Sequence, residues 1–353
     1  MLRIVFADDT NRYDGRTSET RPLGGTESSV CFLAEALAAR GHDVTALTHC
    51  ERPIEHDRVR WTPLGGPRPA DTDVFVAVVH PHLLGAVGRA RRRFLWLCWP
   101  PDNLARRRKI LPMWLRRPFP IFVSEHQTKR YPLLLPRPPR TVVIPFGLAD
   151  YVRGAAELAT PPPPRAIFAS NPVRNLDWLL RLWSRLIHPQ MPEAELHVYG
   201  IRDYDHVFGR PMSAAANRWV AAVPEHARKS IVFQPIVPHR ELAPAMRGAR
   251  VLLYGGHDCE VFCLAVAEAQ ALGVPAVVRP IAVLPERVVD GVSGFVRDGD
   301  EAFADAALRL LRDGELWRRQ HREALRRQQG CSWHEVAERM ERLFLEELGG
   351  GGA

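Results

Sequence analysis

Hydrophobic residues occur along the chain in short strand-like runs that alternate with longer segments of helical period. The run Val251–Tyr254 breaks at Gly255-Gly256, a helical pattern extends from about Phe262 to Gly273, and a second β-rich run follows at Ala276–Val278. A glycine just past a helix, with a proline close behind it, is the usual signal for a helix end. Strand, tight loop, helix and strand form the repeating unit of a parallel α/β sheet.

The same alternation extends through both halves of the chain. The predicted strands are Leu2–Ala7, Val44–Thr48, Val74–Val79, Phe94–Leu97, Ile121–Val123, Val142–Pro145, Arg165–Ala169, Glu195–Tyr199 and Ile231–Phe233. The predicted helices are Ser28–Ala39, Leu176–Leu186, Arg240–Arg247, Glu301–Arg312, Glu315–Gln329 and a last helix to about Leu348, which a Ser332-x-x-Glu335 capping box opens. A chain of 353 residues exceeds one typical core. We therefore predict two domains, 1–155 and 156–330, joined near a stiff run of four prolines, with 331–353 as a final helix and flexible tail.

Composition narrows the class of protein. Hydrophobic residues make up 46% and charged residues 25% of the chain, which is ordinary for a globular protein. The net charge is +8, but only 3 of the 48 basic residues are lysine, and no nucleic-acid-binding motif accompanies the arginines. The six cysteines lack zinc-like spacing, which favours reduced cytosolic thiols. No signal peptide or membrane span is predicted, so we expect a cytoplasmic protein without nucleic acid as a partner.

Two glutamates lie in and near the predicted helix that follows Val251–Tyr254. Glu260 lies at the loop-to-helix junction and Glu268 lies two turns later, so both carboxylates can face one ligand. Between them, the backbone N–H groups of Val261, Phe262, Cys263 and Leu264 are candidate anion donors at a helix N-terminus. From spacing alone, a buried crossover helix with two solvent-facing glutamates explains the pattern equally well.

The segment from Glu260 to Pro275 resembles the donor-site signature of retaining GT-B glycosyltransferases of family four. The resemblance implies that Glu260 contacts the donor sugar, that the amides after it meet the phosphates, and that Glu268 holds the ribose hydroxyls. Cys263 stands where the family usually has glycine, which narrows the expected sugar pocket. The implied fold is two facing Rossmann-like, doubly wound domains with an interdomain cleft and a last helix that crosses back to the first domain.

Arg174 falls where this family carries a Lys or Arg that pairs with the donor diphosphate. A guanidinium suits that role because it stays charged and binds oxygens in bidentate fashion. A surface arginine is the alternative, but a cation near a helix N-terminus opposes the helix dipole, which favours the functional interpretation. The resemblance implies front-side transfer, in which the leaving diphosphate takes the acceptor proton and Arg174 stabilises the developing charge.

The first half resembles the family more weakly. Gly24 and Gly25 occupy the position of its substrate-approaching glycine loop, with a simple turn as the alternative, and they do not complete a G-x-G-x-x-G dinucleotide motif. His80 is expected to line the acceptor pocket, pointing away from His82 because a pair spaced by one residue diverges in extended chain. Cys98-Trp99 replaces a histidine that the family often has near the reacting carbon. Asp71-Thr72-Asp73 precedes a strand, so we interpret it as strand entry and predict no metal site.

The expected activity is therefore metal-independent, retaining transfer of a hexose-type sugar from a UDP- or GDP-type donor to a hydroxyl acceptor, in glycan, glycolipid or polysaccharide biosynthesis. No cofactor beyond the donor substrate is expected. A catalytically silent module that binds nucleotide or glycan is the alternative, because Cys98-Trp99 departs from the family. Ten basic residues between Arg89 and Arg117 lie among apolar ones, including Trp114. They indicate either a solvated arginine-rich face or peripheral contact with the inner face of an anionic membrane.

Overall fold

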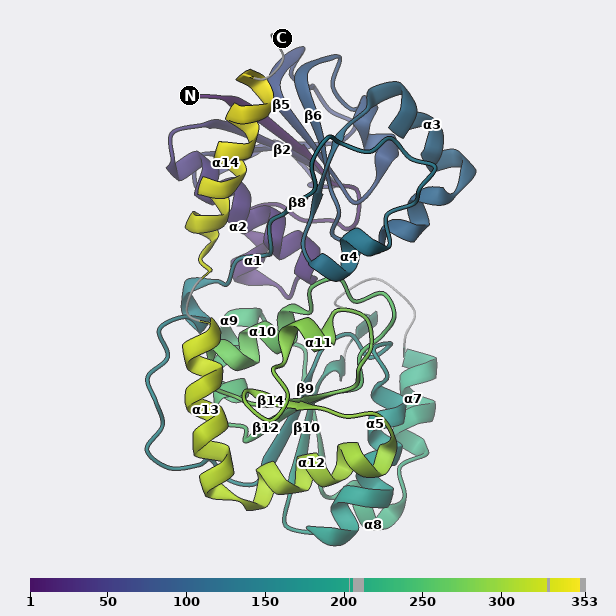
Figure 1. Cartoon of the computed structure of the whole chain (residues 1–353), viewed down its shortest axis with the longest axis vertical. Coiled ribbons are helices and arrows are strands. Elements are labelled where there is room, and N and C mark those ends of the chain that lie inside the picture. The colour runs from purple at the N-terminus through teal and green to yellow at the C-terminus, as the bar shows by residue number, and fades with distance from the viewer. Residues whose placement is uncertain (203, 206–212, 329–330, 350–353) are drawn as a thin grey trace. The chain divides into compact units, whose positions relative to one another are not determined.

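The structure is a computed structural model, and it describes residues 1–202, 204–205, 213–328 and 331–349. The chain forms two compact units, Met1–Ala149 with Cys331–Ala353, and Asp150–Gly330. Figure 1 shows central strands with helices on both sides in each unit. The predicted tail beyond Gly349 lies outside the described residues. All six cysteines are free thiols.

The first unit contains an eight-stranded sheet in the order β3-β4-β2-β1-β5-β6-β7-β8. Its strands are β1 Arg3–Ala7, β2 Asp43–Thr48, β3 Ile54–His56, β4 Val59–Pro63, β5 Asp71–Val78, β6 Arg89–Trp96, β7 Phe119–Phe122 and β8 Val142–Val143. All neighbours pair in parallel except β3, which runs antiparallel to β4. The hairpin β3–β4 was not predicted.

The helices of the first unit cover this sheet. They are α1 Thr17–Thr20, α2 Gly25–Ala39, α3 Arg107–Arg116, α4 Glu125–Lys129 and α14 Trp333–Gly349, with short turns η1 Pro81–Gly85 and η2 Pro101–Ala105. Helix α3 is ten residues long and contains Pro112. A helix tolerates proline when its other hydrogen bonds and packing persist, and Met113 in the same turn is fully buried.

Helix α14 closes the first unit even though it ends the chain. The predicted capping box is confirmed: Ser332 N–H donates to Glu335 Oε2 at 2.5 Å, and Glu335 N–H donates to Ser332 Oγ at 3.1 Å. The helix packs on α2 and β6, where Phe344 meets Phe94 at a ring distance of 4.8 Å. A side chain at Gly147 would strike the Trp333 backbone, so glycine is required there.

The second unit contains a six-stranded parallel sheet in the order β11-β10-β9-β12-β13-β14. Its strands are β9 Arg165–Ala169, β10 Glu195–Arg202, β11 Ile231–Pro235, β12 Val251–Tyr254, β13 Ala276–Val278 and β14 Gly294–Val296. Its helices are α5 Leu176–Leu182, the π-turn η4 Trp183–Ile187, α7 Ser213–Ala221, α8 Glu225–Arg228, α9 His239–Arg247, α10 Leu264–Ala271, α11 Leu284–Arg287, α12 Asp300–Arg312 and α13 Gly314–Gln328, with short turns η3 Asp150–Val152 and η5 His188–Gln190.

In each sheet, the strands that follow one central strand in the chain are added first on one side of it and then on the other. In the first unit β1 lies between β2 and β5, and in the second β9 lies between β10 and β12. Loops that leave the carboxyl ends of such neighbouring strands diverge and open a crevice, the usual place for a ligand in a parallel sheet. Asp8 follows β1, and the loops after β9 and β12 carry Arg174 and Glu260. The topology therefore places two predicted residues, Arg174 and Glu260, at the switch point of the second unit, and Asp8, which was not predicted, at that of the first.

No helix among the described residues is both long and apolar enough to cross a membrane.

Candidate functional site

The loop between β12 and α10 brings Glu260 to the end of its own strand. Tyr254, the last residue of β12, donates its hydroxyl to Glu260 Oε1. Glu260 is 7% exposed, and Arg174 Nε lies 3.4 Å from the same carboxylate oxygen. The predicted sugar contact and the predicted diphosphate contact are thus adjacent. A buried carboxylate next to a guanidinium and a phenol is a preorganised polar site.

The loop after β9 holds Arg174 in place. Asn171 accepts the Arg174 backbone N–H at 2.9 Å, and Asn175, in the left-handed conformation, donates its amide to the Gly256 carbonyl at 2.6 Å. The second bond ties the loop after β9 to the loop after β12. Burial is the largest single influence and disfavours the charged guanidinium, but the charge of Glu260 together with smaller contributions from neighbouring groups outweighs burial and raises the pKa of Arg174. Arg174 is therefore a fixed cation.

Helix α10 begins at Leu264, two residues later than predicted. Val261, Phe262 and Cys263 are buried in the turn before the helix. The helix start offers the N–H groups of Leu264 and Ala265, whereas Ala267 N–H donates to the Cys263 carbonyl at 3.2 Å. Of the four predicted donors, only Leu264 belongs to the helix itself. The helix was predicted to begin too early in the chain because the apolar periodicity extends through this turn.

Cys263 occupies a backbone conformation that favours glycine. Its φ is +65° and its ψ +73°, the left-handed region in which a side chain is strained. The thiol is buried, and burial raises its pKa well above the usual range, so Cys263 stays a neutral thiol.

Glu268 lies on α10 with a different set of partners. The carboxylate is 8% exposed and approaches His239 Nδ1 at 3.4 Å. Burial and the charge of Glu268 together raise the pKa of Tyr151, and the Arg240 guanidinium lies 5.8 Å from the centre of the Tyr151 ring. An imidazole and a phenol are thus the groups that act with the Glu268 carboxylate. Neither His239 nor Tyr151 was predicted, because contacts across 29 and 117 positions leave no local sequence signal.

In the first unit, the predicted glycines begin α2. Gly24 is the N-cap and Gly25 the first helical residue, so the helix starts three residues earlier than predicted. A Cβ at Gly24 would lie 2.4 Å from Glu27 Oε2, which shows that the Glu27 side chain folds back over the helix start. Glu27 is 4% exposed and accepts a hydrogen bond from Asn11. A carboxylate at this position complements the helix dipole.

His80 and His82 do not diverge as predicted. Both imidazoles contact one carboxylate: His80 Nδ1 pairs with Asp9 Oδ1, and His82 Nε2 lies 2.7 Å from Asp9 Oδ2. Their rings stack at 5.5 Å. The prediction assumed extended chain, but Val79 has a φ of +60° and η1 starts at Pro81, so the backbone turns. Burial opposes the charge of Asp9, yet both histidines outweigh it and lower its pKa.

The structure also shows the surroundings of Cys98-Trp99, which departs from the family pattern, and of the Asp71-Thr72-Asp73 motif. Cys98 is buried, and burial raises the pKa of its thiol well above the usual range. Trp99 is 46% exposed and meets the His80 ring edge-on at 5.8 Å. The Asp71-Thr72-Asp73 motif opens β5, as predicted, and its aspartates pair with Arg3 and Arg91. Asp71 and Asp73 are thus engaged by arginines.

Comparison with known proteins agrees with this geometry. Residues 163–313 match the family described as Glycosyl transferases group 1. A D-inositol 3-phosphate glycosyltransferase of Frankia alni is 36% identical over 118 residues, and that of Streptomyces griseus is 37% identical over 107. These matches cover 33% and 30% of this chain, and 29% and 22% of the two relatives. The chain thus spans less than a third of the length of the curated relatives it matches.

Solved structures resemble the whole chain. Sucrose-phosphate synthase from Thermosynechococcus elongatus superposes with a TM-score of 0.78 at 16% identity, covering 99% of this chain and 100% of the other. Anabaena HepE, solved with UDP-glucose, gives 0.73 at 13% identity and covers 98% and 100%. At these identities the likeness establishes the fold, which is GT-B. The match to glycosyl transferases group 1 over residues 163–313 lies within the second unit of this fold.

Proposed function

We propose that this protein transfers a hexose-type sugar from a nucleoside diphosphate sugar to a hydroxyl acceptor, with retention of configuration. The observation that carries the proposal is the buried Arg174–Glu260 pair beside the start of α10, in the unit that matches the family. Glu268, five residues into the same helix, supplies a second buried carboxylate. One cation, one helix start and two carboxylates match the diphosphate, sugar and ribose of such a donor.

Each group has a distinct task in this proposal. Arg174 and the N–H groups at Leu264 and Ala265 hold the diphosphate, because a guanidinium and a helix start both favour anions. Glu260 accepts hydrogen bonds from the sugar hydroxyls, and Tyr254 fixes its orientation. Glu268 accepts hydrogen bonds from the ribose hydroxyls. Arginine carries five N–H donors, so Arg174 can contact Glu260 and phosphate oxygens together.

The chemical step then needs no dedicated protein base. The bond between the sugar's anomeric carbon and the diphosphate oxygen breaks, and a bond to the acceptor oxygen forms on the same face. The acceptor proton passes to the departing diphosphate. Negative charge grows on that leaving group, and Arg174 with the α10 N-terminus stabilises it, which is where most of the catalytic effect should arise.

A uridine diphosphate donor is the first choice among the UDP- and GDP-type donors. HepE was solved with UDP-glucose, and the pneumococcal O-GlcNAc transferase GtfA, which resembles 78% of this chain with a TM-score of 0.58, was solved with UDP and GlcNAc. We assign no base-reading residue to this choice. It rests on these two structural neighbours.

The donor proposal is tested by two measurements on the same protein. A thermal-shift series with UDP-, GDP- and ADP-sugars should raise the unfolding midpoint for one nucleotide class, because a ligand that binds the folded state stabilises it. Slow hydrolysis of that donor without acceptor should release the nucleoside diphosphate. Binding without any hydrolysis would support the silent module instead, and no shift with any donor would reject both. EDTA should leave the initial rate unchanged.

We further propose that the acceptor is presented at an anionic membrane surface on the cytoplasmic side. Helix α3 and the segment after α4 expose five large apolar side chains, namely Leu111, Trp114, Leu115, Leu133 and Leu134. Trp114 Nε1 donates to the Leu134 carbonyl at 3.2 Å, so both segments form one apolar patch. Exposed Arg106, Arg108, Arg116 and Arg117 lie along the same helix. Apolar side chains rimmed by arginine suit an interfacial helix.

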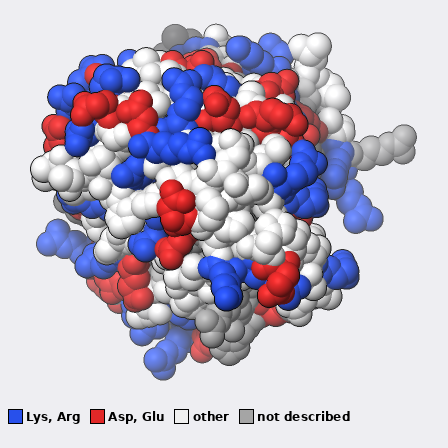
Figure 2. Space-filling view, turned by 90° about the horizontal axis from the view of Figure 1, so that it is seen from below, with Lys and Arg blue, Asp and Glu red and all other residues white. Residues whose placement is uncertain are grey.

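The other arginines of the predicted basic stretch are engaged elsewhere. Arg91 and Arg92 lie in β6 and pair with Asp73 and Glu347, and Arg93 donates to the carbonyls of Leu84 and Val87. They belong to the fold rather than to the patch on α3. On the face of the molecule in Figure 2, basic and acidic side chains intermingle instead of forming a basic stripe. We therefore do not propose nucleic acid as a partner of this face.

Vesicle sedimentation tests the membrane proposal. The protein should bind vesicles that contain anionic lipid at low salt and leave them in high salt. Changing Arg106, Arg107 and Arg108 to Glu should abolish binding. A control with the same charge change, Arg12, Arg21 and Arg52 to Glu, should retain most of it, because these residues lie outside α3. No binding of the wild type at low salt would favour a soluble acceptor.

A further inference from the structure

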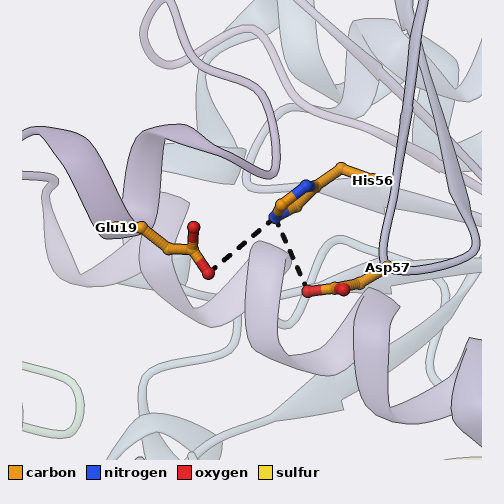
Figure 3. A group of neighbouring side chains, drawn as sticks. All are labelled: Glu19, His56 and Asp57. Atoms are coloured by element: carbon orange, nitrogen blue, oxygen red, sulfur yellow. Dashed lines mark ion pairs between the residues drawn. The ribbon is translucent and has the colours of Figure 1, made fainter.

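A second cluster of chemically active side chains lies in the first unit, outside the residues assigned to donor and acceptor. His56 is the last residue of β3, and Asp57 follows it in the tight turn to β4. Glu19 reaches the same place from α1 (Figure 3). The turn is formed by Asp57 and Arg58, both with positive φ, which aims the Asp57 carboxylate back toward the imidazole.

The three ligand-type atoms are close, but their spacing does not fit hydrogen bonds. His56 Nε2 lies 3.5 Å from Asp57 Oδ2 and 4.0 Å from Glu19 Oε1. The Nε2 atom is buried and has no hydrogen-bond partner among the described residues. A charged imidazole–carboxylate hydrogen bond would be about 2.7–2.9 Å long. The imidazole nitrogen thus has two carboxylates within ion-pair distance but no hydrogen bond within the described part of the chain, which is uncommon for a buried polar atom.

The spacing does fit a shared metal ion. All three ligand atoms lie within 4.8 Å of one another. With metal–ligand bonds of about 2.0–2.2 Å, neighbouring ligands around a tetrahedral ion are roughly 3.4 Å apart. The 3.5 Å separation meets this value, and the 4.0 Å separation needs a shift of a few tenths of an ångström. Glu19 and Asp57 are 62% and 60% exposed, so their side chains can make that adjustment.

We propose that Glu19, His56 and Asp57 bind one divalent transition-metal ion of the Zn²⁺ class, which fastens α1 to the β3–β4 hairpin. One imidazole nitrogen with two carboxylate oxygens suits zinc or cobalt, whereas Mg²⁺ prefers oxygen ligands alone. The ion has a structural role, so it does not alter the metal-independent transfer proposed above.

Binding is measured on the full-length, tag-free protein with Co²⁺ and Zn²⁺ alone. One Co²⁺ per chain should bind and give a visible ligand-field spectrum, without the near-ultraviolet thiolate band that cysteine ligation would produce. Zn²⁺ should displace it and raise the unfolding midpoint by several degrees. His56→Ala should weaken affinity at least 100-fold. Glu19→Gln and Asp57→Asn should each weaken it at least tenfold, and asparagine tolerates the left-handed turn.

The matched control is Glu55→Gln. Glu55 precedes His56 in β3, so its side chain points to the opposite face of the strand. This variant removes one carboxylate at the neighbouring position and should change affinity less than twofold. The absence of stoichiometric binding at sub-millimolar Co²⁺ or Zn²⁺ would overturn the proposal. So would affinity that survives in Glu19→Gln and Asp57→Asn, or a thiolate band in the Co²⁺ spectrum.

Discussion

Each unit buries an acid at the carboxyl end of a central strand, yet the two acids have opposite surroundings. In the second unit Glu260 lies 3.4 Å from Arg174, so its charge is compensated. In the first unit Asp8 is fully buried after β1 and accepts hydrogen bonds from the Tyr13 hydroxyl at 2.6 Å and from Thr10. Burial, reinforced by the charge of Glu27, raises the pKa of Asp8 to about 6.

The difference separates two uses of a buried carboxylate. A carboxylate next to a fixed cation stays charged and can orient polar ligands, which suits recognition of a charged donor. A carboxylate surrounded by neutral donors and another acid resists ionisation and weakens the fold as pH rises. The second unit therefore has the electrostatics expected for a site that binds a diphosphate, whereas the buried acid of the first unit has no cation among the hydrogen-bond partners that the structure describes. Four predictions test this contrast.

The largest effect is expected at Arg174. Arg174→Ala should lower turnover by roughly 10²–10³-fold, because the guanidinium stabilises charge that grows on the leaving diphosphate. Affinity for the intact donor should fall much less, since the ground state carries less of that charge on the leaving oxygen. Steady-state kinetics with the donor identified by the thermal-shift series would measure both quantities.

Glu260→Ala is the matched comparison for Arg174. This variant should weaken binding of the intact donor far more than binding of the free nucleoside diphosphate, because the proposed partner of Glu260 is the sugar. Equal losses for both ligands would contradict that role. If Arg174→Ala weakened donor binding as much as it lowered turnover, the guanidinium would be a simple binding group.

The second prediction concerns how the buried Asp8 carboxyl makes the stability of the folded protein depend on pH. A raised folded-state pKa means that the folded protein holds this proton more tightly than the unfolded chain. The associated stability is present below about pH 4 and is lost as pH rises through 6. The shift of about 2 units corresponds to roughly 3 kcal/mol. Asparagine does not ionise, so the Asp8→Asn variant should not share this loss. Its unfolding midpoint relative to that of the wild type should rise by several degrees as the pH increases from 4 to 7.

Asp9 provides an internal control of opposite sign. Its pKa is lowered, chiefly because pairing with His80 and His82 outweighs burial. Its contribution is present above the unfolded pKa and disappears as pH falls through the folded pKa. Asp9→Asn should thus destabilise the protein at neutral pH and converge with the wild type in acid. The same sign of change in both variants would contradict the contrast between the two neighbours.

The sequence predicted the second unit better than the first for local reasons. Gly255-Gly256 and Gly273 with Pro275 punctuate β12, α10 and β13, and the predicted bounds of both strands are correct. The hairpin β3–β4 was missed because its turn residues, Asp57 and Arg58, are not the usual Asn-Gly pair. The convergence of His80 and His82 depends on a positive φ at Val79, which no propensity indicates.

Among the candidate site residues, those in local motifs were predicted and those that depend on distant neighbours were not. Arg174, Glu260 and Glu268 were predicted because each stands in a motif, and the structure brings the first two within ion-pair distance. Tyr254, His239 and Asp8 were missed, since each gains its meaning only from a neighbour distant in sequence or from burial. Sequence patterns identify residues at strand ends, whereas pairing and desolvation require the fold.

The third prediction concerns Glu268. If its carboxylate holds two ribose hydroxyls, Glu268→Ala should weaken binding of the free nucleoside diphosphate by roughly 1.5–3 kcal/mol, or about 10- to 150-fold. Calorimetry would measure the affinity. Glu241→Ala, which removes an exposed acid from α9, should leave it unchanged. An unaltered affinity in the Glu268 variant would remove this residue from the donor site.

The smallest effect is expected at Cys263, where strain and burial oppose each other. Cys263→Ala keeps a Cβ in the left-handed conformation and loses the buried sulfur, whereas Cys263→Gly loses both the sulfur and the strain. Glycine should therefore be the more stable of the two variants, by about 0.5–1 kcal/mol after its greater unfolded-state entropy is included. Thermal unfolding of both variants would measure the difference. If alanine were the more stable variant, the left-handed conformation of Cys263 would carry no strain. The glycine variant should also bind bulkier donor sugars better than the wild type, because the side chain that narrows the proposed sugar pocket is gone.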